Sequence, residues 1–145
     1  MKKFIFLFLI AFLLVPALAQ AACNYDSSEI IDQGGMAKFE KGGQPVTGTV
    51  CSHYKGRLLT EMPYKSGKKD GVYKTYHGSG KLLSETNFKA GKREGRERMY
   101  YENGKVLVEV HYKADVWDGP YREYDANGKM ATEVIYKNGS VVSNK

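Results

Sequence analysis

The side chains best suited to catalysis or metal binding are scattered along this sequence. His53, His77 and His111 are the only histidines, and no pair of them has the spacing of metal ligands. None lies in a recognisable nucleophile motif, and no cluster of glycines stands ahead of a helix to hold a phosphate. We therefore expect no catalytic residue, no metal site and no cofactor, and a protein that is not an enzyme.

Cys23 and Cys51 are the only cysteines. If the chain is exported, they meet an oxidising compartment in which a disulfide persists, and we favour a bridge between them. Two alternatives stay open, namely two unrelated free thiols or a lipid anchor at Cys23. The alanines before Cys23 suit a bacterial lipoprotein signal, whereas Gln20 stands where such a signal usually has an apolar residue.

Residues 1–19 have the features of a signal peptide. Lys2 and Lys3 precede an apolar run from Phe4 to Val15, which is shorter than a membrane span. Small residues follow, and cleavage after Ala19 or Ala21 fits them; we place it at Ala19. The alternative is an uncleaved N-terminal anchor. We expect an exported chain, periplasmic or extracellular, that contacts a membrane only through its N-terminus.

The charge balance argues against a nucleic-acid partner. The chain has 22 basic and 16 acidic residues, and loss of Lys2 and Lys3 would reduce its charge from +6 to +4. Residues of the two signs are interspersed, which is typical of a solvated surface rather than of a basic patch.

A 24-residue period organises most of the chain. A fixed period of this size is typical of repeat arrays, in which each unit packs on its neighbours. We place repeats at about 48–70, 71–94, 95–118 and 119–142, with one residue fewer in the first. Residues at this spacing are Gly71, Gly95 and Gly119; Gly56, Gly80, Gly104 and Gly128; Glu61, Glu85, Glu109 and Glu133; and Tyr64, Phe88, Tyr112 and Tyr136.

Each repeat has the pattern of a β-hairpin. Asn103-Gly104 and Asn127-Gly128 are strong signals for a two-residue turn with positive φ at both positions. A second turn recurs at Ser66-Gly67, Ala90-Gly91 and Asn138-Gly139, with Ala114-Asp115 in the third repeat. Between turns, apolar and polar residues alternate with period two, as in Val106–Tyr112.

These patterns predict an all-β fold. Successive hairpins should pair into an elongated, twisted antiparallel sheet. The predicted organisation is a signal peptide at 1–19, an N-terminal cap or partly disordered segment at 20–38, and a repeat domain at 39–145, with a degenerate copy beginning near Phe39.

The recurring glutamates should form a column that could bind a cation or a basic partner. We favour a simpler interpretation, in which each carboxylate pairs with a basic residue and stays solvated. The basic residues four positions before the glutamates are Arg57, Lys81, Lys105 and Lys129.

Aromatic residues should stack in columns along one face of the sheet. One column is Tyr64, Phe88, Tyr112 and Tyr136, and another is Tyr76, Tyr100 and Tyr124. Most of these rings should be the packing of the sheet itself. Alternation places a further set on the opposite face from Tyr76, Tyr100 and Tyr124, as a candidate exposed partner surface. Its members are Tyr73, Met99, Tyr101, Trp117 and Tyr121.

The sequence resembles MORN-variant repeat proteins of the type grouped with the YwqK-like antitoxin family. The resemblance rests on Gly-x-x-x-x-Tyr, then Asn-Gly-Lys, then Glu-x-x-Tyr-Lys-x-Gly, over about residues 36–140. It implies hairpin arrays that act as binding or scaffolding surfaces.

We expect an exported, non-enzymatic binding or scaffold module that recognises a protein or an envelope component through one sheet face. Two alternatives remain, namely a self-associating structural protein of the envelope and an antitoxin-like or immunity-like protein. The partner and the oligomeric state are left open by the sequence.

Overall fold

The structure is a computed structural model that describes residues 23–144. The predicted signal peptide and its cleavage site at Ala19 lie outside the described residues. Within residues 23–144, no helix is long and apolar enough to cross a membrane.

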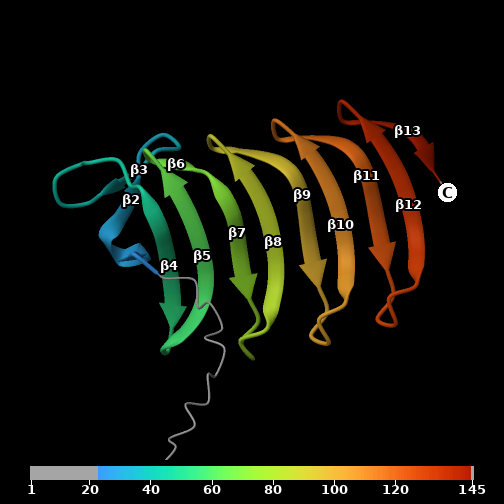
Figure 1. Ribbon diagram of the computed structural model, residues 1–145, viewed down its shortest axis with the longest axis horizontal. Helices are drawn as coiled ribbons and strands as arrows, with labels where there is room; N and C mark the ends of the chain where they lie inside the picture. The colour runs from blue at the N-terminus through green and yellow to red at the C-terminus, as the bar shows by residue number, and fades with distance from the viewer. Residues whose placement is uncertain (1–22, 145) are drawn as a thin grey trace, which may run out of the picture.

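The described chain forms one long, mostly antiparallel sheet of 11 strands, which confirms the predicted fold class (Figure 1). The strand order is β1-β4-β5-β7-β8-β9-β10-β11-β12-β13, with β6 beside β5 and with β2 and β3 in a separate pair. The elements are β1 (Tyr25–Asp26), the 3₁₀ turn η1 (Ser27–Glu29), β2 (Ile30–Asp32), β3 (Ala37–Phe39), β4 (Gly48–Tyr54), β5 (Arg57–Lys65), β6 (Lys68–Lys69), β7 (Gly71–Tyr76), β8 (Leu82–Lys89), β9 (Lys92–Tyr100), β10 (Val106–Lys113), β11 (Val116–Tyr124), β12 (Met130–Lys137) and β13 (Ser140–Asn144).

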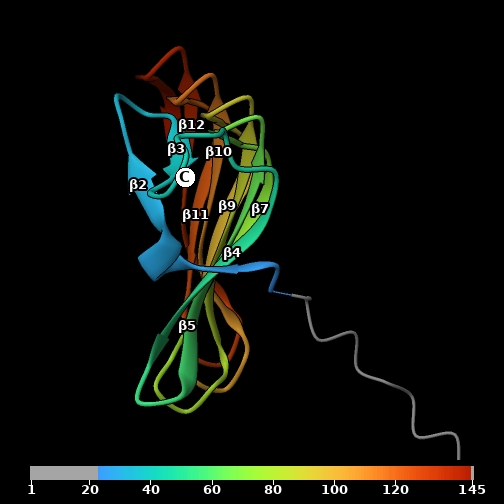
Figure 2. The same ribbon diagram turned by 90° about the vertical axis from the view of Figure 1, so that its left-hand side faces the viewer.

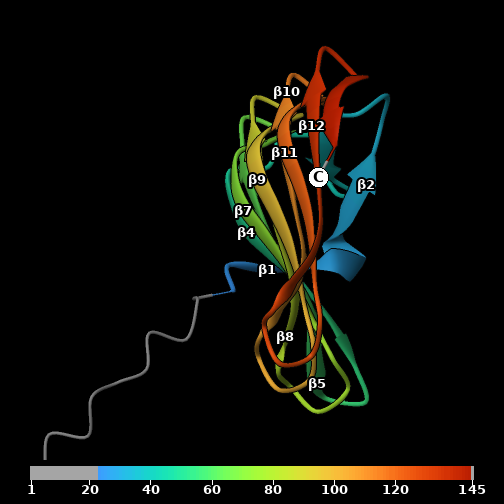
Figure 3. The ribbon, with the colours of Figure 1, turned by 90° about the vertical axis from the view of Figure 1, so that its right-hand side faces the viewer.

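From β4 onward the sheet follows the chain, so each long strand pairs with its neighbours in sequence. Figures 2 and 3 view the sheet from its two ends and show successive strands rotated against one another, as the intrinsic twist of β-strands requires. Each repeat therefore contacts chiefly the repeats next to it in sequence, as expected for a linear array.

The Asn-Gly turns differ from the sequence-based prediction. Gly104 and Gly128 have φ of +81° and +86°, but neither Asn103 nor Asn127 has positive φ. The amide of Gly104 donates to the carbonyl of Tyr101 over 2.8 Å, which defines a longer turn closed by one left-handed glycine. Asn103 Oδ1 accepts from the amide of Lys105 at 2.9 Å, so the side chain supports the turn without left-handed backbone at Asn103.

Two-residue turns with positive φ at both positions recur at the opposite edge of the array, and one more, Lys55-Gly56, joins β4 to β5. Their residues have φ between +48° and +91°, including the non-glycine pair Ala114-Asp115. A side chain from earlier in the chain accepts a hydrogen bond from the first amide of each turn at that opposite edge. It is the Thr47 hydroxyl for Ser66-Gly67, at 2.9 Å, and an acidic residue for the three later turns. The bonds are Asp70 to Ala90 at 3.1 Å, Glu94 to Ala114 at 2.8 Å and Asp118 to Asn138 at 3.2 Å.

A cap covers the N-terminal end of the sheet on one side, where β2 projects in Figures 2 and 3. The cap is defined here as residues 27–46, comprising η1, β2, β3 and the segment up to Val46. Val46 is fully buried against Ala37 and Val50. The regular hairpins begin at Gly48, the residue at which the first repeat was placed, and β3 pairs with β2 outside the main sheet.

The N-terminus of the described chain is fastened to the first hairpin. Cys23 and Cys51 form a disulfide, and Tyr25 and Asp26 of β1 run parallel to β4. The backbone amide of Asn24 donates to the carbonyl of Thr49 at 2.9 Å, and Oδ1 of Asn24 accepts from the amide of Thr49 at 2.8 Å.

Candidate functional site

The sheet presents two faces of different chemistry. The charged face is defined by a row of directly paired residues from β5 to β12, and the aromatic face by the residues that alternate with them along each strand. The row on the charged face is Glu61, Lys74, Glu85, Arg98, Glu109, Arg122 and Glu133.

Acidic and basic residues alternate along this row and form a charge ladder. Arg98 lies 2.7 Å from Glu109 and 3.9 Å from Glu85, and Arg122 lies 2.7 Å from Glu133 and 3.3 Å from Glu109. Glu109 is only 7% exposed. Its burial opposes ionisation, but Arg98 beside it holds the pKa of the carboxyl below its ordinary value.

Each glutamate of the row pairs with a basic residue, as predicted, but the partner lies on the neighbouring strand and is not the residue four positions earlier. Glu61 and Glu109 are also buried, whereas the prediction left these carboxylates solvated. Lys81 Nζ donates to the carbonyl of Glu102 at 2.7 Å, and Lys105 Nζ to that of Asn127 at 2.8 Å. Arg57 likewise reaches the carbonyl of Gly78 at 2.8 Å. These three basic residues lie at the turn edge of the sheet, away from the glutamate row. Each one therefore bonds to a carbonyl in the turn of the next hairpin.

Tyr76 and Tyr100 belong to the charged face. The hydroxyl of Tyr100 donates to Glu85 at 2.6 Å. Burial and this carboxylate raise the pKa of Tyr100 to about 12, and burial with Glu61 raises that of Tyr76 to about 12. The prediction that both aromatic columns share one face is therefore wrong, since Tyr64, Phe88, Tyr112 and Tyr136 occupy the other face.

The aromatic face is built by contacts between neighbouring repeats. The ammonium of Lys69 lies 5.2 Å from the ring centre of Phe88, and the guanidinium of Arg93 lies 4.1 Å from that of Tyr112. In the next repeat Trp117 replaces the cation and packs edge-on against Tyr136 at 4.7 Å. Each hairpin thus covers the column residue of the following hairpin.

Trp117 is the centre of an aromatic cluster. Its ring stacks on Tyr121 with centroids 5.6 Å apart, and it also meets Tyr112 edge-on at 6.5 Å. The hydroxyl of Tyr121 donates to Glu123, and this bond together with burial raises the pKa of Tyr121 to about 12. The cluster therefore presents large, rigid rings beside a carboxylate.

The structure brings four of the five predicted surface residues onto the aromatic face. Tyr73, Met99, Trp117 and Tyr121 lie there, with Met99 exposed and the three rings half-buried. Tyr101 lies instead in the turn after β9, where its hydroxyl donates to the carbonyl of Tyr124 at 2.9 Å.

Sequence reasoning did not include two carboxylates of the aromatic face. Glu97 is paired across the sheet with Thr86 and Val110, and no ion pair of Glu97 occurs within residues 23–144. Glu123 lies beside Tyr121. Glu97 is two residues from Met99 in β9, and Glu123 is two residues from Tyr121 in β11. Because side chains alternate between the faces of a strand, the sequence alone places both carboxylates on this face.

The three histidines contact different residues and do not form a cluster. His53 lies 3.5 Å from Asp26, His77 lies 3.6 Å from Glu102, and the ring of His111 is 3.2 Å from the carbonyl of Pro120. In the part of the chain that the structure describes, no group of three or more His, Cys, Asp and Glu side chains is arranged to hold a metal ion.

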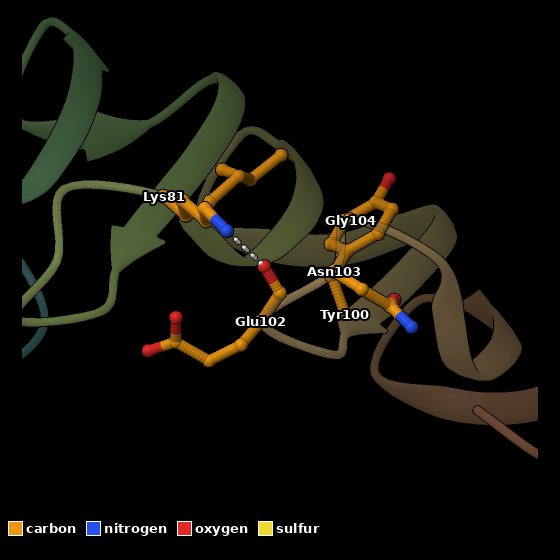
Figure 4. A pocket seen from close by; sticks show the side chains of 6 residues that line it. Lys81, Tyr100, Glu102, Asn103 and Gly104 are labelled. Carbon is orange, nitrogen blue, oxygen red and sulfur yellow. Dashed lines mark hydrogen bonds between the residues drawn. The ribbon is translucent and has the colours of Figure 1, made fainter.

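A shallow groove of about 380 Å³ lies at the turn edge, between the β7–β8 and β9–β10 hairpins. Figure 4 shows Lys81 spanning it to the carbonyl of Glu102, beside the ring of Tyr100. Because the cation already bonds to a backbone carbonyl, this groove is chiefly a joint between adjacent turns.

Taken together, these features define an open array of β-hairpins with a self-paired charged face and an aromatic face. Three consecutive segments, residues 69–90, 93–114 and 117–138, match the MORN repeat variant. The chain therefore contains three consecutive MORN repeat variants, each spanning two paired strands, and such repeats commonly serve in binding and scaffolding. The match does not confirm the YwqK-like assignment.

Two solved structures show a limited likeness. A crystal structure of a mutant of S. aureus TarM in complex with fondaparinux, alpha-GlcNAc-glycerol and UDP has a TM-score of 0.44 and 14% identity, over 80% of this chain and 21% of that chain. A second crystal structure of TarM has a TM-score of 0.42 with the same identity and coverage. No curated protein sequence matches the chain.

Proposed function

We propose that this protein is an exported, non-enzymatic binding module that recognises a protein or an envelope component on its aromatic face. The observation that carries the proposal is the aromatic cluster of Trp117, Tyr121 and Tyr136, with exposed Met99 on the same face. Tyr, Trp and Met are enriched in protein interfaces because they supply contact area at a low entropic cost.

The charged face is less suited to this role. The carboxylates of Glu109 and Glu133 are already bonded to arginines at 2.7 Å. A partner would have to replace these bonds while burying the same charges, which is costly in a low-dielectric environment. On the aromatic face, by contrast, the carboxylate of Glu97 forms no ion pair within the described residues.

Two further features support the export part of the proposal. The N-terminal sequence has the order of a signal peptide, with Lys2 and Lys3 before the apolar run. Cys23 and Cys51 are joined, and disulfides persist in oxidising compartments. Intact-mass measurement of the exported chain should give a start after Ala19 or Ala21, whereas full-length chain confined to the cytoplasm would contradict export.

Site-specific photo-crosslinking tests the binding face directly. Met99 and Val72 are both 38% exposed, but they lie on the aromatic and the charged face respectively. A photoreactive residue at Met99 should capture a specific partner in cells that export the protein, and one at Val72 should not. Equal capture at both positions, or capture at Val72 alone, would contradict the proposal.

A second candidate function is self-association as a structural protein of the envelope. It is favoured by β13, in which Val141 and Val142 are 56% and 60% exposed, since an exposed apolar strand can pair with another chain. Sedimentation over a range of concentrations tests it, because this role requires a size that grows with concentration. An immunity-like role, implied by the YwqK-like resemblance, would be a form of the first proposal in which the partner is a toxin.

A further inference from the structure

The fold gathers basic side chains that the sequence intersperses with acidic ones. Residues 65–70 and 89–94 form two neighbouring turns with their adjoining strand ends, at the upper edge of the sheet in Figure 1. Each segment has three basic residues and one acidic residue, so together they carry a net charge of +4. An excess equal to that of the whole chain without Lys2 and Lys3 is thus concentrated in two turns.

Four of these basic residues face one side of the sheet as directly opposed pairs. Lys65 pairs with Lys68, and Lys89 pairs with Lys92. The adjacent cross-strand pairs contain column residues of the aromatic face, so alternation places all four lysines on the charged face. We call them the lysine quartet. All four are exposed, and a Cβ at Gly91 would lie 3.9 Å from that of Lys68, so the two pairs are neighbours.

The quartet is not neutralised by ion pairs of its own chain. None of its members forms an ion pair within residues 23–144. Asp70 and Glu94 accept instead from the first amide of the following turns, at 3.1 and 2.8 Å. Asp115, which lies near Lys92, accepts from the amide and Nε of Arg93. Because like charges directly opposite each other destabilise a sheet, a bound polyanion would offset this repulsion.

The surroundings of the quartet favour a hydrated partner. The residues between the paired lysines are Ser66-Gly67 and Ala90-Gly91, which supply no large apolar side chain. Protein interfaces depend on such anchors and are depleted in lysine, and a membrane contact would have no apolar group to insert. The lysines recur across strands that are about 4.8 Å apart. This arrangement suits a linear polymer with charges spaced along its chain.

We propose that the lysine quartet binds a linear acidic polysaccharide, whose carboxylates lie against successive lysines. The site is separate from the aromatic face of the proposed function. It depends on that proposal only for export, which would bring the chain to such a polymer. Since the lysines are exposed point charges, salt should weaken the binding strongly.

Polygalacturonate, a linear polyuronate, is the probe, and neutral dextran is the control polymer. Isothermal titration of the disulfide-intact protein should give saturable binding of polygalacturonate at low ionic strength and none of dextran. Binding should be largely lost at roughly 0.5 M salt, where screening acts over a few ångströms.

Two double variants with the same net charge separate the quartet from the overall charge. Lys89→Gln with Lys92→Gln should weaken binding about tenfold, because each exposed charge pair contributes a few-fold to affinity. Lys55→Gln with Lys129→Gln removes the same charge from exposed turns at the opposite edge and should change affinity little. Lys89→Arg with Lys92→Arg should retain binding, and circular dichroism should show each variant folded.

Three outcomes would overturn the inference. They are no saturable binding of polygalacturonate, equal losses in the two glutamine variants, and tighter binding to a competing probe than to polygalacturonate. The competing probes are polyglutamate, as an acidic polypeptide, and vesicles of phosphatidylglycerol, as an anionic membrane. Crosslinking through Met99 reports on the other face, so the proposed function stands or falls independently of this result.

Discussion

Arg98 on β9 donates from Nε to Oε2 of Glu109 on β10 over 2.7 Å, although the two residues are 11 positions apart in the sequence. The pair is one step of a ladder in which charges alternate from β5 to β12. Each basic residue of the ladder faces acidic residues on both neighbouring strands. The ladder therefore stabilises the correct strand register over a shifted one.

Replacement of Arg98 tests the ladder. Arg98→Met should lower the free energy of unfolding by roughly 1–3 kcal/mol, because Glu109 stays buried with only Arg122 beside it. Lys137→Met is the control, since Lys137 pairs with Asp118 at 3.0 Å but is 61% exposed, and it should change stability little. Urea unfolding of both variants measures this difference. Similar small losses would mean that the ladder does not stabilise the sheet.

Substitution at the longer turns tests their backbone geometry. Gly104 has φ of +81°, so Gly104→Val forces a β-branched residue into the left-handed region and should cost roughly 1–3 kcal/mol. Ser79→Val, at the position that precedes the corresponding glycine of the second hairpin, should cost less because Ser79 does not have positive φ. Thermal unfolding compares the two, and a larger loss at Ser79 would contradict the turn geometry.

Removal of the disulfide should release the cap more than the array. The bridge joins residues 28 apart, and chain-entropy estimates give roughly 3–4 kcal/mol for a loop of this size. Cys23→Ser is the preferred variant, because Cys23 is exposed and buried Cys51 stays unchanged. Hydrogen exchange should rise in residues 24–46 and much less in β8–β12. Equal increases throughout would show that the cap and the hairpins unfold as one unit.

Stability should fall at alkaline pH through the tyrosines that face carboxylates. The pKa of Tyr100 is about 12 in the folded chain against 10.0 ordinarily. Below pH 10 the hydroxyl is protonated in both states and its contribution is complete. Between pH 10 and 12 the unfolded chain loses the proton first, so the free energy of unfolding decreases as pH rises.

Urea unfolding of the wild type and Tyr100→Phe across this pH window measures the effect. The variant should show a smaller loss than the wild type, with a remainder from Tyr76 and Tyr121, whose pKa values are also about 12. Identical pH dependence in the two proteins would rule out a contribution from Tyr100.

The sequence predicts the hairpin array because spacing alone carries that information. Gly71, Gly95 and Gly119 recur in phase with alternating strand residues, and no other regular structure fits this pattern. The surface residues Tyr73, Met99, Trp117 and Tyr121 follow from alternation within single strands.

The partners of the ladder could not be predicted in the same way. Arg98 meets Glu109 through cross-strand register, which depends on turn length and on the irregular pairing between Val106 and Val108. Lys105 is only four residues from Glu109 in the sequence, but in the fold its Nζ bonds to the carbonyl of Asn127 in the next turn. The face shared by Tyr112 and Trp117 likewise depends on the two-residue turn between β10 and β11, whose type a single sequence does not fix.

If the hairpin is the unit of this structure, deletion of residues 95–118 should remove one whole unit and leave the others intact. The deletion keeps the turn and strand phases, brings Glu85 beside Arg122 in the ladder and places Arg93 ahead of Tyr136.

Thermal unfolding of this deletion, compared with deletion of residues 95–106 alone, is the decisive measurement. The in-phase deletion should give a folded protein with a cooperative transition at a moderately lower temperature, because one interface between repeats is lost. The half-repeat deletion should lower the unfolding temperature far more, because it joins β9 directly to β10 and reverses which residues of the joined strand lie on each face. If the in-phase deletion unfolds as badly as the half-repeat deletion, the chain is a closed globular domain and not a linear array.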